Sequence, residues 1–91
     1  MQERAYDTFM DVTRKYYPTH TAGYVQRAHF EVSTFGSNEM ANATFIEAME
    51  NVDEGDASIH NDYALFLRKH MGEVDLAESQ FLIGFETNYA Y

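Results

Sequence analysis

Apolar and polar residues alternate in two segments of the chain, and this alternation constrains the fold more than any other feature. In the first segment, residues 24–35, Ala28, Phe30 and Val32 would lie on one side of a strand. If the segment were instead a helix ending before Gly36, Phe30 would point away from the other apolar residues into water. The alternation therefore predicts a strand. Its polar side would carry four residues: Arg27, His29, Glu31 and Ser33.

The second alternating segment closes the chain. Its alternate positions are all aromatic, apolar or threonine: Phe81, Ile83, Phe85, Thr87, Tyr89 and Tyr91. Asp75 and Glu78 just before it resemble the capping pair of a helix. A helix continuing through Gly84 would lose about 1 kcal/mol at that glycine. We therefore expect a short helical turn and then a strand from about Gln80.

The remaining apolar residues recur at steps of three and four, which is the spacing of one helical face. This spacing predicts a helix over residues 3–17, ended by Pro18, which cannot continue a helix. Ser37 or Asn38 can cap a second helix that runs to about Val52. A third helix is expected from Asp56 or Ser58 to a C-terminal cap at Gly72.

These elements predict an α+β fold, a single domain spanning residues 1–91 with about three helices packed on a two-stranded antiparallel sheet. Two strands are needed because one strand alone cannot satisfy its backbone hydrogen-bonding groups. The alternative is an all-α fold of four to five short helices, separated by the same breaks at Pro18, Gly36, Gly55 and Gly72.

Charge is distributed unevenly along the chain, whose formal net charge is −9. Residues 31–62 contain no lysine or arginine and eight acids: Glu31, Glu39, Glu47, Glu50, Asp53, Glu54, Asp56 and Asp62. A nucleic-acid-binding protein normally presents a basic face, so this chain is expected to repel DNA and anionic membranes. The first residues lack the apolar stretch of a secretory signal, and a cytoplasmic location is expected.

The residue types that usually carry enzymatic or metal chemistry do not occur here in the required patterns. There is no cysteine, and the four histidines lack the spacing of a metal motif. The acidic turn from Asp53 does not match a calcium loop, because Gly55 comes too early. Two carboxylates could form the acid and base pair of a small hydrolase, but we expect these acids to be solvated. The sequence therefore predicts no catalytic residues, no metal and no cofactor.

The acidic stretch favours a protein-binding function over an enzymatic one. Helical residues advance about 1.5 Å each, so closely spaced acids approach the charge density of a DNA strand, about one charge per 3.4 Å. We therefore predict a DNA mimic, an inhibitor of the anti-restriction or anti-CRISPR type made by phages, which occupies the site of a basic nucleic-acid-binding protein of the host. The predicted partner-binding acids are Glu47, Glu50, Asp53, Glu54, Asp56 and Asp62. A structural or assembly subunit of a viral or cellular complex is the alternative, and a carboxylate-dependent hydrolase ranks third.

Tyrosine is frequent, with seven copies in the chain. Its aromatic body and polar tip make it common at protein interfaces. Tyr89 and Tyr91, at the end of the sequence, are predicted to contact a partner or a second copy of the chain, which would make the protein a homodimer.

Overall fold

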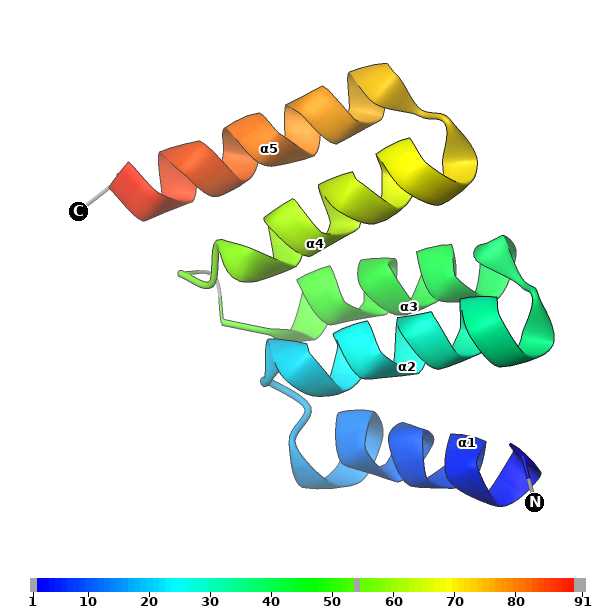
Figure 1. The fold of residues 1–91 in the computed structure, drawn as a ribbon. Helices are drawn as coiled ribbons and strands as arrows, with labels where there is room; N and C mark the ends of the chain where they lie inside the picture. Colours follow the sequence, from blue (N-terminus) through cyan, green and yellow to red (C-terminus); the bar gives the residue numbers. More distant parts are fainter. Residues whose placement is uncertain (1, 54, 90–91) are drawn as a thin grey trace. The chain divides into compact units, whose positions relative to one another are not determined.

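The computed structural model describes residues 2–53 and 55–89, and every regular element within these ranges is a helix (Figure 1). The elements in chain order are α1 (Gln2–Asp11), the π-helical segment η1 (Val12–Tyr16), α2 (Thr21–Phe35), α3 (Asn38–Asn51), α4 (Ser58–Phe66), the π-helical segment η2 (Leu67–Met71) and α5 (Val74–Tyr89). The predicted α+β fold is therefore wrong, and the all-α alternative with five helices agrees with the structure.

The chain divides into two compact units, which we describe separately. Unit 1 is Met1–Val52 and contains α1, η1, α2 and α3; unit 2 is Asp53–Tyr91 and contains α4, η2 and α5. In unit 1, α2 packs against both α1 and α3, and in unit 2, α4 and α5 form a helical hairpin (Figure 1). The assignment of residues 1–91 to a single domain stays a prediction.

The helix boundaries follow the capping and breaking residues of the sequence. The predicted helix over residues 3–17 is α1 continued by η1, and it stops before Pro18. Ser37 caps α3, because its hydroxyl oxygen accepts a hydrogen bond from the Met40 backbone N–H at 3.1 Å. Gly36 and Gly72 follow α2 and η2 with φ of 63° and 66°, in the left-handed region that glycine enters without a steric cost.

The segment predicted to be the first strand is α2, because the side chain that seemed wrong for a helix is covered by another helix. The Phe30 ring packs against two rings of α1, with ring centroids 5.2 Å from Phe9 and 6.0 Å from Tyr6. Phe35, at the end of α2, meets the Tyr6 and Phe30 rings edge to face. A helix that packs on two sides needs two apolar faces. The sequence analysis compared a strand with a helix that has only one apolar face, and for this reason it predicted a strand incorrectly.

The polar side of that predicted strand is also partly buried. Arg27 and Glu31 are 4% and 1% exposed, whereas a strand facing water would have left both in solvent. They lie four residues apart, one helical turn, with the Arg27 Nε 3.6 Å from a Glu31 carboxylate oxygen. Two of the four polar residues in the alternating pattern are therefore a buried charged pair within a helix.

The C-terminal segment predicted as the second strand belongs to α5, which runs through Gly84. A Cβ atom at Gly84 would lie 2.7 Å from the Asn61 side-chain oxygen and 3.3 Å from the Ala57 carbonyl oxygen, both of unit 2. The glycine thus permits close approach of the two helices, which offsets its low helix propensity. Ile83 and Phe85 remain 40% and 59% exposed, so their alternation does not reflect burial on a sheet. Tyr91 lies outside the described residues.

No helix in the described ranges has the length and apolar character needed to cross a membrane.

Candidate functional site

Glu47, the first of the predicted partner-binding acids, lies between two arginines of unit 1. Arg14 donates to its carboxylate from Nε at 3.2 Å and from Nη2 at 2.9 Å. Arg27 donates to the same two oxygens from Nη1 at 3.1 Å and from Nη2 at 3.2 Å. One carboxylate on α3 is therefore held by a base from η1 and a base from α2, in the two-pronged geometry that favours arginine.

Arg27 is the buried centre of this arrangement. Besides Glu47, its Nη1 donates to the Thr13 hydroxyl at 3.1 Å, and its Nε lies 3.6 Å from Glu31 without a hydrogen bond. The Thr13 hydroxyl lies 2.9 Å from the Phe9 carbonyl oxygen, one turn earlier in the same helical stretch. The guanidinium thus has polar partners from three helical elements, as a buried charge requires.

Glu31 completes the cluster from the opposite side of Arg27. The Tyr6 hydroxyl donates to one of its oxygens at 2.5 Å, and the Thr44 hydroxyl donates to the other. Tyr6 comes from α1 and Thr44 from α3, so the carboxylate on α2 connects both neighbouring helices. We call the set of Tyr6, Thr13, Arg14, Arg27, Glu31, Thr44 and Glu47 the charge cluster.

The charge cluster shifts the acidities of its members. The hydrogen bonds from Arg14, joined by those from Arg27 and by the charges of both bases, lower the pKa of Glu47 from its ordinary 4.5 to about 2, against the opposing effect of burial. Burial raises the pKa of Tyr6, and its hydrogen bond to Glu31 raises it further. Glu47 is thus ionised and Tyr6 neutral near pH 7.

These observations give the charge cluster a structural role in unit 1, with Arg27 and Glu31 buried and Arg14 at its exposed edge. Its two arginines and two glutamates have no net charge, and its carboxylates already accept hydrogen bonds from side chains of the same unit. The sequence analysis missed Arg27 and Glu31 as interior residues. The signal that could have found them is their four-residue spacing, which brings opposite charges together only on a helix.

The other predicted acids occupy different environments in the two units. Glu50 on α3 and Asp53 after it are exposed. Asp56 lies two residues before α4, and its carboxylate accepts from the backbone N–H of Ser58, the first residue of α4, at 2.9 Å and from the Ser58 hydroxyl at 2.5 Å. Asp62 is half-buried on α4, and Glu54 lies outside the described residues. Glu47 and Glu50 belong to unit 1 and the others to unit 2, so one continuous acidic surface stays a prediction.

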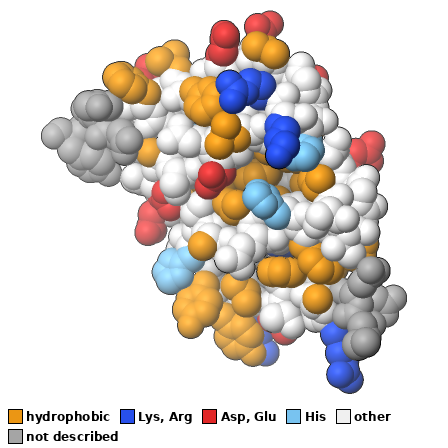
Figure 2. Space-filling view, in the orientation of Figure 1, with side chains coloured by type: hydrophobic (Ala, Val, Ile, Leu, Met, Phe, Trp, Pro, Cys, Tyr) orange, Lys and Arg blue, Asp and Glu red, His pale blue; other side chains and the backbone are white. Residues whose placement is uncertain are grey.

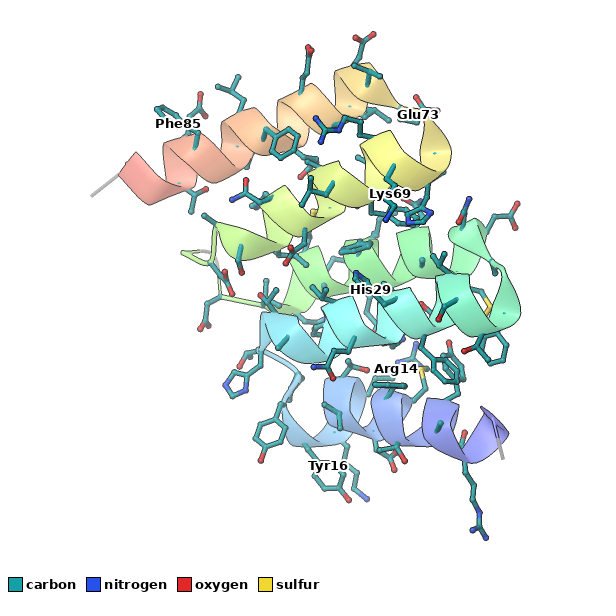
Figure 3. All side chains as sticks on the ribbon, viewed as in Figure 1. Arg14, Tyr16, His29, Lys69, Glu73 and Phe85 are labelled. Atoms are coloured by element: carbon teal, nitrogen blue, oxygen red, sulfur yellow. The ribbon has the colours of Figure 1, made fainter. Side chains whose placement is uncertain are left out.

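Exposed aromatic residues occur where the sequence analysis did not single them out. Tyr16 and Tyr17, at the end of η1, are 59% and 55% exposed, and the Tyr16 side chain points away from the helices (Figure 3). Tyr17 stacks on His20 with the ring centroids 5.3 Å apart. Of the two tyrosines predicted to contact a partner, Tyr89 ends α5 with its side chain outside the description, and Tyr91 is not described at all.

The α4–α5 hairpin presents a second group of exposed side chains, which are apolar. They are at least 40% exposed and include five residues of α5: Val74, Leu76, Leu82, Ile83 and Phe85. Hydrophobic side chains are visible on the surface over α5 in Figure 2, close to lysine and arginine side chains. Large exposed apolar groups in proximity commonly mark an interaction surface.

Within residues 2–53 and 55–89, no three histidine or acidic side chains gather in a way that could hold a metal ion.

Comparisons of the chain with protein-family models, with curated proteins and with solved structures found no match.

Proposed function

We propose that this chain is a non-enzymatic acidic module that binds a basic nucleic-acid-binding protein and occupies its nucleic-acid site. The observation that carries the proposal is the distribution of charge along the chain. The two bases and two acids that form ion pairs in the charge cluster of unit 1 have charges that cancel one another. The whole surplus of nine negative charges therefore comes from side chains outside that cluster.

The proposed contact residues are the acids that follow Glu47 along the chain. Glu50 and Asp53 are exposed, and the sequence adds Glu54, Asp56 and Asp62 within the next nine residues. An array of carboxylates can replace phosphates in a basic cleft, and its attraction to the cleft falls as salt screens exposed charges. Glu47 contributes less than its neighbours, because its carboxylate is already held by Arg14 and Arg27.

The test is capture of proteins from a lysate of the source organism, followed by competition with duplex DNA. The variant replaces Glu50 and Glu54 by glutamine and Asp53 by asparagine, and keeps Glu47 so that unit 1 stays intact. A matched control replaces three acids elsewhere, Asp7→Asn, Asp11→Asn and Glu39→Gln, and removes the same charge.

We expect the captured protein to be nucleic-acid-binding, to be released by DNA and by raised salt, and to bind the triple variant at least about 10-fold more weakly than the control. If both variants bind equally well, or if DNA does not compete, the proposal is wrong.

A structural or assembly subunit is the second candidate function. The exposed apolar residues of α5 support it, because assembly interfaces bury such side chains. An assembly subunit would retain its partner at high salt, unlike a mimic whose binding depends on exposed charge.

A further inference from the structure

One side of α5 carries exposed apolar residues around a single carboxylate. Val74, Leu82 and Phe85 are 52%, 57% and 59% exposed, and Glu78 between them is also exposed. Successive helical residues are about 100° apart, so these four positions fall within about 80° of one another. We call them the α5 stripe.

The α5 stripe lies away from the side of α5 that packs on α4. Ala77 and Gly84, which face α4, are buried, and Phe85 points away from α4 (Figure 3). Gln80, half-buried on the same helix, accepts a hydrogen bond at its side-chain oxygen from the ring Nδ1 of His60 of α4 at 2.9 Å. The exposed residues of the stripe therefore lie on a different side of α5 from its contact with α4.

The carboxylate of Glu78 restricts which kind of partner can cover the α5 stripe. Covering Glu78 with apolar groups alone would remove water from a charge without replacing it, which is unfavourable. Residues 73–91 hold Glu73, Asp75, Glu78 and Glu86 but no lysine or arginine, so α5 itself supplies no cation. A suitable partner must therefore bring its own base to the middle of an apolar contact.

A second copy of the chain satisfies this requirement poorly. Its α5 would bring the same four acids and no base to the contact. The two bases of residues 53–91 are Arg68 and Lys69 in η2, and the Arg68 guanidinium lies over the Phe81 ring at 5.9 Å. Charge complementarity instead favours a different protein.

We infer that the α5 stripe binds an amphipathic helix of a partner protein, one with apolar side chains at steps of three and four and with lysine or arginine among them. The apolar side chains cover Val74, Leu82 and Phe85, and a base pairs with Glu78. Binding of this kind, an apolar helix face against an open groove or face, recurs in peptide recognition. The α5 stripe shares no residue with the acids of the proposed function, so the two can be altered independently.

The probes are two fluorescently labelled helical peptides of about 16 residues, with leucines at steps of three and four. One has lysine at the remaining positions and the other has glutamate. Fluorescence anisotropy with the full chain measures their affinities. We expect the lysine peptide to bind at least about 10-fold more tightly than the glutamate peptide.

Matched variants separate the stripe from general attraction to an acidic protein. Leu82→Ser and Phe85→Ser should each weaken binding of the lysine peptide about 10-fold, as expected for central apolar contacts. Leu76→Ser removes a leucine that is 53% exposed, similar to Leu82, but on another side of α5, and should change the affinity by less than about 2-fold. Glu78→Gln should weaken binding several-fold and reduce its salt dependence, whereas Glu39→Gln on α3 should do neither.

Equal binding by the Leu82→Ser and Leu76→Ser variants, with circular dichroism showing both folded, would overturn the inference. So would a dimer of the parent chain in sedimentation that Phe85→Ser converts to a monomer, because the second copy would then be the occupant. Neither result bears on the capture experiment with Glu50, Asp53 and Glu54, so the two proposals fail separately.

Discussion

The two units of this chain are both helical, but different interactions hold them together. In unit 1 a buried arginine joins three helical elements through two carboxylates and one hydroxyl, and aromatic rings of α1 and α2 pack against one another. In unit 2, α4 and α5 approach closely at a glycine. Unit 1 has seven acids and four bases by sequence, and unit 2 has eight acids and two bases. Ion pairs therefore help to hold the helices of unit 1 together, whereas unit 2 carries six of the nine net negative charges.

The largest expected effect is that of Arg27→Met. The substitution leaves the buried Glu31 without its nearest base and removes one of the two bases on Glu47, so we expect a loss of about 3–5 kcal/mol in the free energy of unfolding. Urea denaturation followed by circular dichroism measures it. Arg14→Met, at a side chain that is 58% exposed, is the control and should cost about 1 kcal/mol or less. Equal losses for the two variants would contradict the central position of Arg27.

Lowering the pH should have the second-largest effect, a loss of stability in unit 1. The folded-state pKa of Glu47 lies below its ordinary value, at about 2, so the stabilisation is complete above pH 4.5 and is lost as pH falls from there towards 2. We expect about 2 kcal/mol after allowance for its partial exposure. Stability measured by urea denaturation at several pH values should fall more in this window for the parent than for Arg14→Met, in which one cause of the lowered pKa is gone. Identical pH dependence in both proteins would refute this assignment.

Gly84→Ala tests the contact that holds unit 2. The new methyl group meets the Asn61 oxygen at 2.7 Å and the Ala57 carbonyl oxygen at 3.3 Å, so we expect a loss of about 1–2 kcal/mol although alanine favours helix. In an Asn61→Ala background the closest clash is absent, and Gly84→Ala should then be nearly neutral. Thermal denaturation of the four proteins gives the coupling between the two sites. Additive effects would mean that the helices do not meet at this point.

Asp56→Ala should have the smallest effect, about 0.5–1 kcal/mol. It removes the carboxylate that accepts from the Ser58 backbone N–H at the start of α4. Hydrogen exchange of the α4 amides measures the local change, and amides of α2 serve as the internal control. Asp56→Asn keeps an acceptor and should recover most of the loss, whereas an equal loss in both variants would mean that charge and not the cap is responsible.

Helix ends were predictable from the sequence, because they depend on local chemistry. Pro18 removes a backbone donor, Ser37 offers a capping oxygen, and Gly36 and Gly72 adopt a left-handed conformation. These signals lie within a few residues of the boundary that they set. The all-α alternative relied on such breaks, and this is why it agrees with the structure.

Which faces of α2 and α5 are buried was not predictable, because it depends on residues far apart in the sequence. Phe30 seemed out of place on a helix until α1 supplied Phe9 and Tyr6, and Glu31 is buried only because Tyr6 and Thr44 donate to it. At the other end, Phe85 is apolar but exposed, so its alternation with Ile83 carried no information about burial. Glu47 was predicted to contact a partner from its place in the acidic stretch, and no spacing rule reveals that Arg14, 33 residues earlier, donates a hydrogen bond to it.

The position of Arg27 also has a consequence for how unit 1 assembles during folding. Its guanidinium lies near Glu31 one turn away on α2 itself, but it meets Thr13 of η1 and Glu47 of α3 only when both of these elements have docked on α2. An intermediate with α2 docked on one neighbour alone would hold a dehydrated cation short of partners, and such a species is high in free energy. The helices of unit 1 should therefore dock in one cooperative step, because partly docked states leave Arg27 with too few polar partners.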